Sequence, residues 1–142
     1  MNWFEGKKIL VPIDFSEESH RALDEALQMV SLTTDVCAVN VGVNLSVTSP
    51  ESVWGALSEK SQRDHIEEAF WKNFADERYR VIDFRVSFGD PGHEIAKCAE
   101  EIGADVIVIP SHGRTGIKRI LLGSVAERVV RLAHCPVFVL RD

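Results

Sequence analysis

The fold is decided by residues 8–30, which read KILVPIDFSEESHRALDEALQMV. The first part, Lys8–Ile13, contains the uninterrupted apolar run Ile9-Leu10-Val11, which is typical of a strand buried on both faces of a parallel sheet. A helix is predicted next, because Ser16 is a suitable N-cap and two acidic residues follow it in the first turn. The apolar residues of this helix recur at helical spacing and are Ala22, Leu23, Ala26, Leu27 and Val30.

The same alternation of strand and helix continues to the end of the chain. Four further strands are predicted at Asp35–Val43, Tyr79–Phe88, Asp105–Pro110 and Pro136–Leu140. Three further helices are predicted at Ser61–Arg78, from Asp90 as N-cap to Gly103 as stop, and at Ser124–Ala133. Asn44–Ser61 is expected to be a crossover loop with at most a short helix near Trp54 and Leu57. This alternation predicts an α/β fold, in which an open parallel sheet carries helices on both faces.

Length and composition favour one domain spanning residues 1–142. A usual domain has roughly 100–200 residues, and 45% of this chain is hydrophobic and 27% charged. No apolar run reaches the roughly 18 residues that a membrane-spanning helix needs, and Met1–Lys8 does not resemble a signal peptide. The formal net charge of −6 disfavours binding to nucleic acid or anionic membranes through the whole surface.

The cysteines and histidines disfavour both a disulfide framework and a metal site. The three cysteines are few and scattered, and no Cys-x2-Cys, His-x3-His or His-Glu-x2-His spacing occurs. We therefore expect reduced thiols, a cytoplasmic location and no structural zinc. The tryptophans, Trp3, Trp54 and Trp71, are expected in packing or dimer contacts rather than stacked on a nucleotide.

The loop after the fourth predicted strand, Ser111–Ser124, is the candidate ligand site, because open sheets bind ligands outside the carboxyl ends of their strands. It contains three glycines and the basic residues Arg114, Lys118 and Arg119, without an acidic residue. Glycines let main-chain N–H groups approach a phosphate, and the helix that begins at Gly123-Ser124 adds free N–H groups and a favourable dipole. The first predicted helix instead begins with two glutamates, which repel phosphate.

Each of these features also has a purely structural interpretation. Ser124 and Glu127 fit the Ser-x-x-Glu capping box, in which the serine only caps its own helix. The basic residues can form a solvated loop face, Asp14 can simply begin the first helix, and His112 can be an ordinary loop residue. The Gly-x-Gly-x2-Gly fingerprint and the Walker loop are both absent from the sequence.

Three segments of the chain carry a more specific signal. They are Ile9–Ser16 with its Pro-x-Asp-x-Ser turn, Gly103–Ile109, and Ser111–Val130 followed by Cys135–Val137. Together they resemble the UspA-like family of universal stress proteins, and the resemblance covers essentially the whole chain. It implies an adenine nucleotide alpha hydrolase-like fold with strand order 3-2-1-4-5, in which the switch point lies between the first and fourth strands.

The ATP-binding branch of that family carries the motif Gly-x2-Gly-x9-Gly-Ser/Thr. Here Gly113, nine residues and Gly123-Ser124 match the later part of the motif, whereas Pro110 replaces its first glycine. Proline has no N–H and its φ is fixed near −65°, so any contact from that amide is lost. We expect this replacement to weaken or alter nucleotide binding rather than to abolish it.

The resemblance also implies a role for the residues of the site. Asp14 would hydrogen-bond the ribose or adenine side of the ligand, and Val41 would contact the adenine through its backbone. Ser124 and nearby main-chain N–H groups would hold the phosphates. The predicted cofactor-binding residues are Pro12, Asp14, Val41, Ser111, His112, Gly113, Arg114, Gly123, Ser124 and Val125.

The function that the resemblance implies is a regulatory stress-response protein that binds ATP, with or without Mg²⁺, and hydrolyses it slowly at most. It also implies a homodimer through the last strand, Val137, Phe138, Val139 and Leu140. Pro110 leaves open the alternative of a dimeric interaction module that binds no nucleotide. A nucleotidyl-transferring enzyme is disfavoured, because His20 lies too far from Asp14 for a His-x-Gly-His motif. An electron-transfer flavoprotein is a further alternative, because it would share this α/β architecture.

Overall fold

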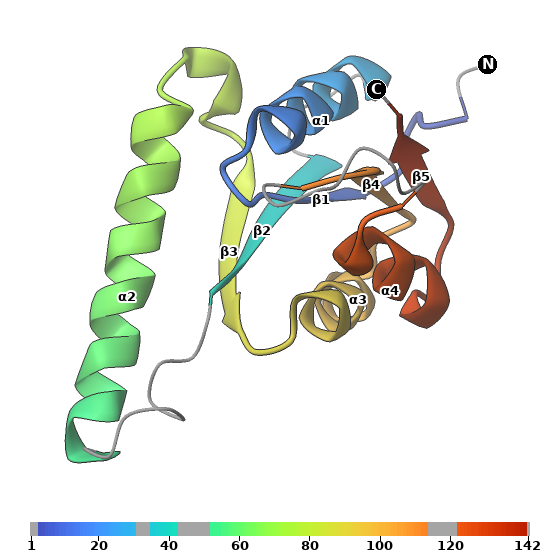
Figure 1. The fold of residues 1–142 in the computed structure, drawn as a ribbon. Helices are drawn as coiled ribbons and strands as arrows, with labels where there is room; N and C mark the ends of the chain where they lie inside the picture. The colour runs from blue at the N-terminus through green and yellow to red at the C-terminus, as the bar shows by residue number, and fades with distance from the viewer. Residues whose placement is uncertain (1–2, 31–34, 43–51, 114–121, 142) are drawn as a thin grey trace.

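A central sheet organises the computed structural model, which describes residues 3–30, 35–42, 52–113 and 122–141. Its strands are β1 (Ile9–Pro12), β2 (Val36–Gly42), β3 (Asp83–Phe88), β4 (Val106–Pro110) and β5 (Val137–Leu140). They lie in the order β3-β2-β1-β4-β5, and every neighbouring pair is parallel (Figure 1). The predicted open sheet of order 3-2-1-4-5 is therefore confirmed.

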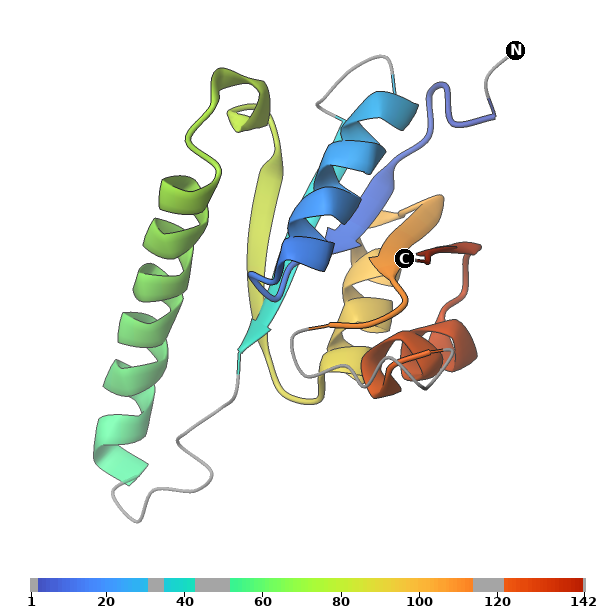
Figure 2. The ribbon, with the colours of Figure 1, turned by 45° about the horizontal axis from the view of Figure 1, so that its top comes forward.

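Helices cover both faces of this sheet. They are α1 (Glu17–Met29), α2 (Ser52–Asn73), α3 (Pro91–Ile102) and α4 (Ser124–Leu132). In Figure 1, α1 lies above the sheet, α3 and α4 lie together below it, and α2 stands beside β3. The tilted view in Figure 2 shows the same grouping. None of the helices within the described residues is long and apolar enough to cross a membrane.

Two separate apolar cores lie on the two faces of the sheet, because successive side chains of a strand point to opposite sides. In the first core, Ile9 and Val11 of β1 pack with α1 and with Phe70 of α2. In the second, Leu10 of β1 packs with α3 and with Val129 of α4. All four residues of β1 are buried, which confirms the prediction of a strand covered on both faces.

The helix ends predicted from capping residues are also confirmed. Ser16 Oγ accepts a hydrogen bond of 3.1 Å from Ser19 N, and Asp90 Oδ2 accepts one of 3.0 Å from His93 N. Gly103 ends α3 with φ at 68°, a left-handed conformation that glycine adopts without strain. Local side-chain chemistry therefore sets the first residue of α1 and both ends of α3.

Helix α2 begins earlier than predicted. The structure places its first residue at Ser52, whereas the sequence favours a loop up to Ser61. The residues between them read SVWGALSEKS and include several good helix formers and a single glycine. Their helical propensity outweighs the serines that favour a loop.

Strand β3 is shorter than predicted, because a 3-10 turn, η3 (Glu77–Tyr79), separates it from α2. The Asp76 side chain caps this turn by accepting a hydrogen bond of 3.0 Å from Arg78 N. The Tyr79 ring is 2% exposed and packs edge-on against Phe74 at 5.0 Å. The Tyr79 ring therefore belongs to the core under the turn, and Tyr79 is not part of the strand.

Candidate functional site

A cavity of about 330 Å³ opens at the carboxyl ends of β1, β2 and β4. The predicted site residues that line it are Pro12, Asp14, Val41, Ser111, His112, Gly113, Gly123, Ser124 and Val125. The remaining predicted residue, Arg114, lies outside the described residues, as do Lys118 and Arg119. The fold thus gathers nine of the ten predicted residues around one cavity, from segments more than a hundred residues apart in the sequence.

Asp14 stands in a tight turn between β1 and α1. Its Oδ1 accepts a hydrogen bond of 3.0 Å from Ser16 N and a second one from Ser16 Oγ. Its own N–H donates to Ser19 Oγ at 3.3 Å. Phe15 adopts a φ of 64°, which is strained for a bulky side chain and is typical of functional sites. Asp14 helps to begin α1, as one interpretation of the sequence holds, and its carboxylate is fixed at the cavity wall.

Gly113 brings the loop after β4 against this turn. A Cβ atom at Gly113 would lie 2.6 Å from Asp14 Oδ2, closer than any side chain tolerates. A side chain at this position would force the Asp14 carboxylate to shift, so the glycine lets the loop after β4 lie against the turn after β1, on the two sides of the switch point.

Helix α4 begins without a side-chain cap. Its N-cap is Gly123, and within the described residues no side chain caps it; Ser124 is the first helical residue. The capping-box interpretation of Ser124 and Glu127 is therefore wrong by one position, and the Glu127 carboxylate pairs instead with Arg131 at 2.8 Å. Ser124 and Val125 are exposed at the cavity. The first turn of α4 thus offers main-chain N–H groups and one hydroxyl to a ligand.

Pro110, the last residue of β4, also lines the cavity. The N–H groups of Ile107 and Ser111 donate to carbonyls of the β5 segment at 3.0 and 2.8 Å, so the nitrogen of Pro110 between them faces β1. The pairing of β1 with β4 ends at Leu10 and Ile107, well before Pro110. The proline therefore replaces no hydrogen bond of the described sheet, and it removes one donor from the cavity wall.

The cavity walls combine apolar surface with few charges. The apolar side chains come from β2, β4 and α3 and include Val39, Ile109 and Ile95. Of the lining residues, Asp14 and His112 are the titratable ones within the described part of the chain. Ser111, only 3% exposed, holds its Oγ 3.2 Å from His112 Nδ1. Such a cavity suits a ligand with one flat apolar part and one polar part.

The sequence interpretation missed Asn40, a cavity residue of β2 that is 9% exposed. Its Nδ2 donates a hydrogen bond of 2.6 Å to the carbonyl of Ile13, just beyond the end of β1. The one signal in the sequence is an amide side chain within the apolar run Val36–Val41. Such a residue in a buried strand needs a partner, but the sequence does not name that partner.

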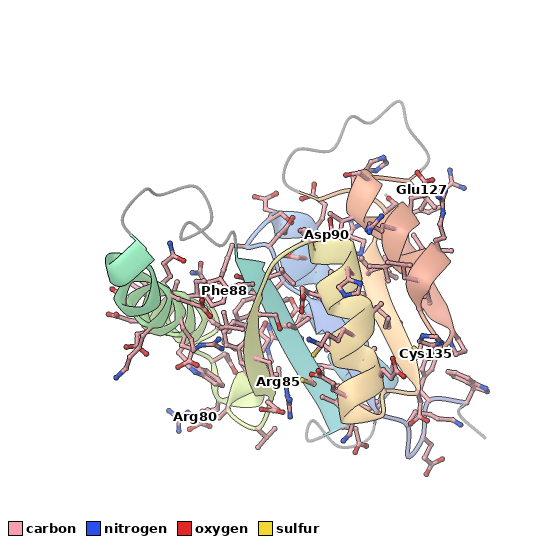
Figure 3. The ribbon with its side chains drawn as sticks, turned by 90° about the horizontal axis from the view of Figure 1, so that it is seen from below. Arg80, Arg85, Phe88, Asp90, Glu127 and Cys135 are labelled. Carbon is pink, nitrogen blue, oxygen red and sulfur yellow. The ribbon has the colours of Figure 1, made fainter. Side chains whose placement is uncertain are left out.

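An ion pair fixes α4 against α3 beside the cavity. Arg128 Nε lies 2.6 Å from Asp90 Oδ2, and Figure 3 shows Asp90 and Glu127 at neighbouring ends of the two helices. The His93 N–H and the Arg128 guanidinium hold the pKa of Asp90 below its ordinary value. A Cβ at Gly92 would lie 2.6 Å from Arg128 Cγ, so the glycine makes room for this contact. The open end of α4 is thus tied to a neighbouring helix.

Within the described residues, no group of three or more histidine, cysteine or acidic side chains is placed to hold a metal ion. The three cysteines are unpaired thiols, and burial raises the pKa of Cys37 to about 12. Neither observation adds a reactive group to the cavity.

Comparison with known proteins places this geometry in a family. The model of the universal stress protein family matches residues 6–141. Universal stress protein MJ0531 of Methanocaldococcus jannaschii is 39% identical over 140 residues, which cover 95% of this chain and 82% of that protein.

Solved structures agree with this match. The structure of MJ0577 from the same organism has a TM-score of 0.78 and 34% identity, with 96% of each chain covered. A family member from Arabidopsis thaliana, solved with AMP bound, shares the fold at a TM-score of 0.58 and 20% identity, covering 96% of this chain and 92% of that one. The adenine nucleotide alpha hydrolase-like fold is therefore the fold of this chain as well. With its family match over residues 6–141, the chain belongs to the universal stress protein family.

Proposed function

We propose that this protein binds an adenine nucleotide, ATP in the first place, in the cavity at the carboxyl ends of β1, β2 and β4, and that it acts as a regulatory stress-response protein. The observation that carries the proposal is the uncapped start of α4, which opens into the same cavity as Asp14 and the apolar walls. The AMP bound to the Arabidopsis relative supports an adenine nucleotide as the ligand class.

The phosphates bind at the loop and helix end in this proposal. The N–H groups of Gly113, Ser124 and Val125 and the hydroxyl of Ser124 are the donors, and the positive end of the helix dipole attracts the anion. The Gly123 N–H donates to the Ser111 carbonyl at 2.6 Å, so Gly123 shapes the site and supplies no donor. Arg114 adds a positive charge to the same loop in the sequence. When Mg²⁺ accompanies ATP, it lies on the phosphates and needs no dedicated set of protein ligands.

The nucleoside binds along the strand ends. Asp14, whose carboxylate is fixed by Ser16, accepts hydrogen bonds from ribose hydroxyls, and Val41 presents its peptide group to the base. Pro12, Ser111 and His112 complete the wall between the two parts.

Hydrolysis is expected to be slow at most, which suits a regulatory protein. Of the lining residues that the structure describes, Asp14 and His112 are the groups that could activate water. Asp14 is committed to its turn, and His112 Nδ1 lies 3.2 Å from Ser111 Oγ. Neither is assigned to catalysis.

A homodimer through β5 is the second part of the proposal. This strand is the edge of the described sheet, with β4 as its neighbour. Phe138 on β5 is 41% exposed, and its ring lies 6.0 Å from Phe4, which in turn packs on the exposed Trp3. An edge strand flanked by exposed aromatic rings favours pairing with a second copy. Sedimentation of Phe138→Lys, expected to be monomeric, against the wild type tests this part. The cytoplasmic location remains a prediction.

The second candidate function is a dimeric interaction module that binds no nucleotide. The loss of an N–H at Pro110, which lines the cavity, is the observation that favours it. The first candidate function requires the start of α4 to bind phosphate, and the second does not.

The variant Ser124→Glu tests the phosphate site. Glutamate at the first position of a helix favours the helix dipole, so the fold is expected to keep its stability, while the added charge repels phosphate. Calorimetric titration with MgATP should give binding for the wild type and at least tenfold weaker binding for the variant. The matched control, Ser61→Glu, adds the same charge to an exposed position of α2 and should bind as the wild type does. Equal affinities of all three proteins would contradict the phosphate site, and no binding to the wild type would favour the interaction module.

A further inference from the structure

We propose that Asn40 determines the base specificity of this site by keeping the peptide group of Val41 open for a 6-aminopurine. The inference rests on the proposed function, because it concerns the base of the same nucleotide. The carrying observation is that Asn40 bonds the one carbonyl that would otherwise extend the β1–β2 ladder over Val41.

The register of the sheet shows which way Val41 faces. Gly42 O accepts a hydrogen bond from Gly89 N, directly after β3, so the peptide groups of Gly42 face β3. Peptide groups of successive strand residues alternate in direction, so those of Val39 and Val41 face β1. The hydrogen bond of 2.7 Å from Ile13 N to Val39 O confirms that direction for Val39.

The next main-chain hydrogen bond between β1 and β2 is absent among the described residues. A regular parallel ladder would continue with a hydrogen bond from Val41 N to Ile13 O. That carbonyl instead accepts from Asn40 Nδ2 at 2.6 Å, and no backbone bond between Val41 and Ile13 occurs among the described residues. Beyond Ile13 the chain turns away through Asp14 and Phe15, whose φ is 64°. The peptide group of Val41 therefore faces the cavity that it lines.

The Asn40 side chain points to the face of the sheet that α1 covers, and its bond to the Ile13 carbonyl holds it there. Asn40 is 9% exposed, and Ile13, whose carbonyl it bonds, belongs to the core under α1 and α2. A buried carbonyl needs a donor, and the amide supplies one without using a main-chain N–H of β2. Within the described residues, no main-chain hydrogen bond uses the N–H or the C=O of Val41, so both face the cavity for a ligand.

The N–H and C=O groups of Val41 match the hydrogen-bonding edge of adenine. A strand residue presents its N–H and C=O side by side in one direction. Adenine offers a ring nitrogen that accepts next to a 6-amino group that donates, whereas a 6-oxopurine offers an acceptor in place of the amino group. The site should therefore prefer adenine nucleotides over inosine and guanine nucleotides.

The first test compares ATP with inosine triphosphate, which differs at the 6-position and in the protonation of N1. The dissociation constants of the wild type should differ by about 100-fold, roughly tenfold for each of two mismatched hydrogen bonds. In Asn40→Leu and Asn40→Asp, which lack the donor, Val41 N–H can close on the Ile13 carbonyl, and the ratio should fall to about tenfold or less. Two variants are used because a buried carboxylate can destabilise the fold.

The matched control is Asn73→Leu. Asn73 Nδ2 also donates to a main-chain carbonyl, that of Ala69 at 2.7 Å, but it lies at the end of α2, away from the cavity. This control should keep the wild-type ratio. A folded Asn40→Leu that keeps the wild-type ratio would overturn the inference, and so would a wild type that binds both nucleotides equally.

A measurement without nucleotide separates the inference from the proposed function. The Val41 amide of the free wild type should exchange its hydrogen at least tenfold faster than that of Asn40→Leu, in which it gains the Ile13 carbonyl as a partner. Equal exchange rates would overturn the role of Asn40. If the wild type binds neither nucleotide while the rates differ as expected, the proposed function fails and the structural role of Asn40 stands.

Discussion

Two of the helices that begin at the cavity, α1 and α4, have different first turns. The start of α1 is closed by its own side chains, since Ser16 caps the helix, Asp14 bonds Ser16, and two glutamates occupy the first turn. The start of α4 has glycine as N-cap, no side-chain cap within the described residues, and Ser124 exposed. Both follow strands that flank the switch point.

The difference lies in whether side chains of the protein satisfy the N–H groups at the start of the helix. The four N–H groups at a helix start need partners, and side chains satisfy them at α1. At α4 the Gly123 N–H bonds the Ser111 carbonyl, and the N–H groups of the first turn meet no side-chain cap within the described residues. In the proposed function these N–H groups bind the phosphates, which the helix dipole attracts. The closed end still contributes to the cavity, because its internal bonds hold the Asp14 carboxylate in place. In the proposed function, the turn after β1 orients the nucleoside and the start of α4 binds the phosphates.

The largest expected effect comes from adding a Cβ atom at Gly113, where the loop after β4 lies against the turn before α1. In Gly113→Ala the new Cβ would lie 2.6 Å from Asp14 Oδ2, and relief of this overlap should cost about 1–3 kcal/mol of unfolding free energy. Denaturant unfolding of Gly113→Ala, Asp14→Ala and the double variant measures the coupling. The cost of the alanine should shrink when Asp14 is truncated. Purely additive effects would contradict the contact.

The second prediction compares the two helix starts directly. Ser16→Ala removes a side-chain cap and should lower the unfolding free energy by about 1 kcal/mol. Ser124→Ala removes a hydroxyl that caps nothing among the described residues and should change it by less than about 0.5 kcal/mol. Urea unfolding of both variants without nucleotide is the measurement. Equal losses would mean that α4 is capped after all.

The smallest expected effect concerns α3, whose start is also closed. The pKa of Asp90 lies below its ordinary value of 3.8 because of the His93 N–H and Arg128. A lowered pKa in the folded state gives stability that is present above pH 3.8 and is lost as the pH falls through the folded value. Asp90→Asn should flatten the decrease in melting temperature in that acidic range. An unchanged dependence of the melting temperature on acidic pH would show that the Asp90 carboxylate does not stabilise the fold.

The parts of the fold that the sequence predicted correctly depend on residues that are neighbours in the chain. An uninterrupted apolar run identified β1 as a strand buried on both faces, and glycine, proline and acidic residues located the ends of α3. The loop Ser111–Ser124 was indicated as a site by its glycines, its basic residues and the helix that follows it. The strand order and the roles of Asp14 and Val41 came from the resemblance to the family that the comparison matches.

The features that were predicted wrongly or missed have different physical causes. Whether Ser124 caps α4 or follows the cap differs by one residue, and the capping-box pattern cannot distinguish the two. Tyr79 suits a strand by type, yet burial against Phe74 places it in a turn. The partner of Asn40 is a carbonyl 27 positions earlier in the chain, which a local pattern does not reveal.

Thermal unfolding of the wild type during titration with MgATP, with GTP in parallel, tests the central claim most directly. At about 100 times its dissociation constant, a ligand of the folded state adds roughly 2.7 kcal/mol to the unfolding free energy. That corresponds to several degrees in a domain of this size. The open start of α4 predicts a saturating increase with MgATP, and the peptide group of Val41 predicts a much smaller increase with GTP. An unchanged melting temperature at millimolar MgATP would contradict the phosphate site and leave the protein as a dimeric interaction module.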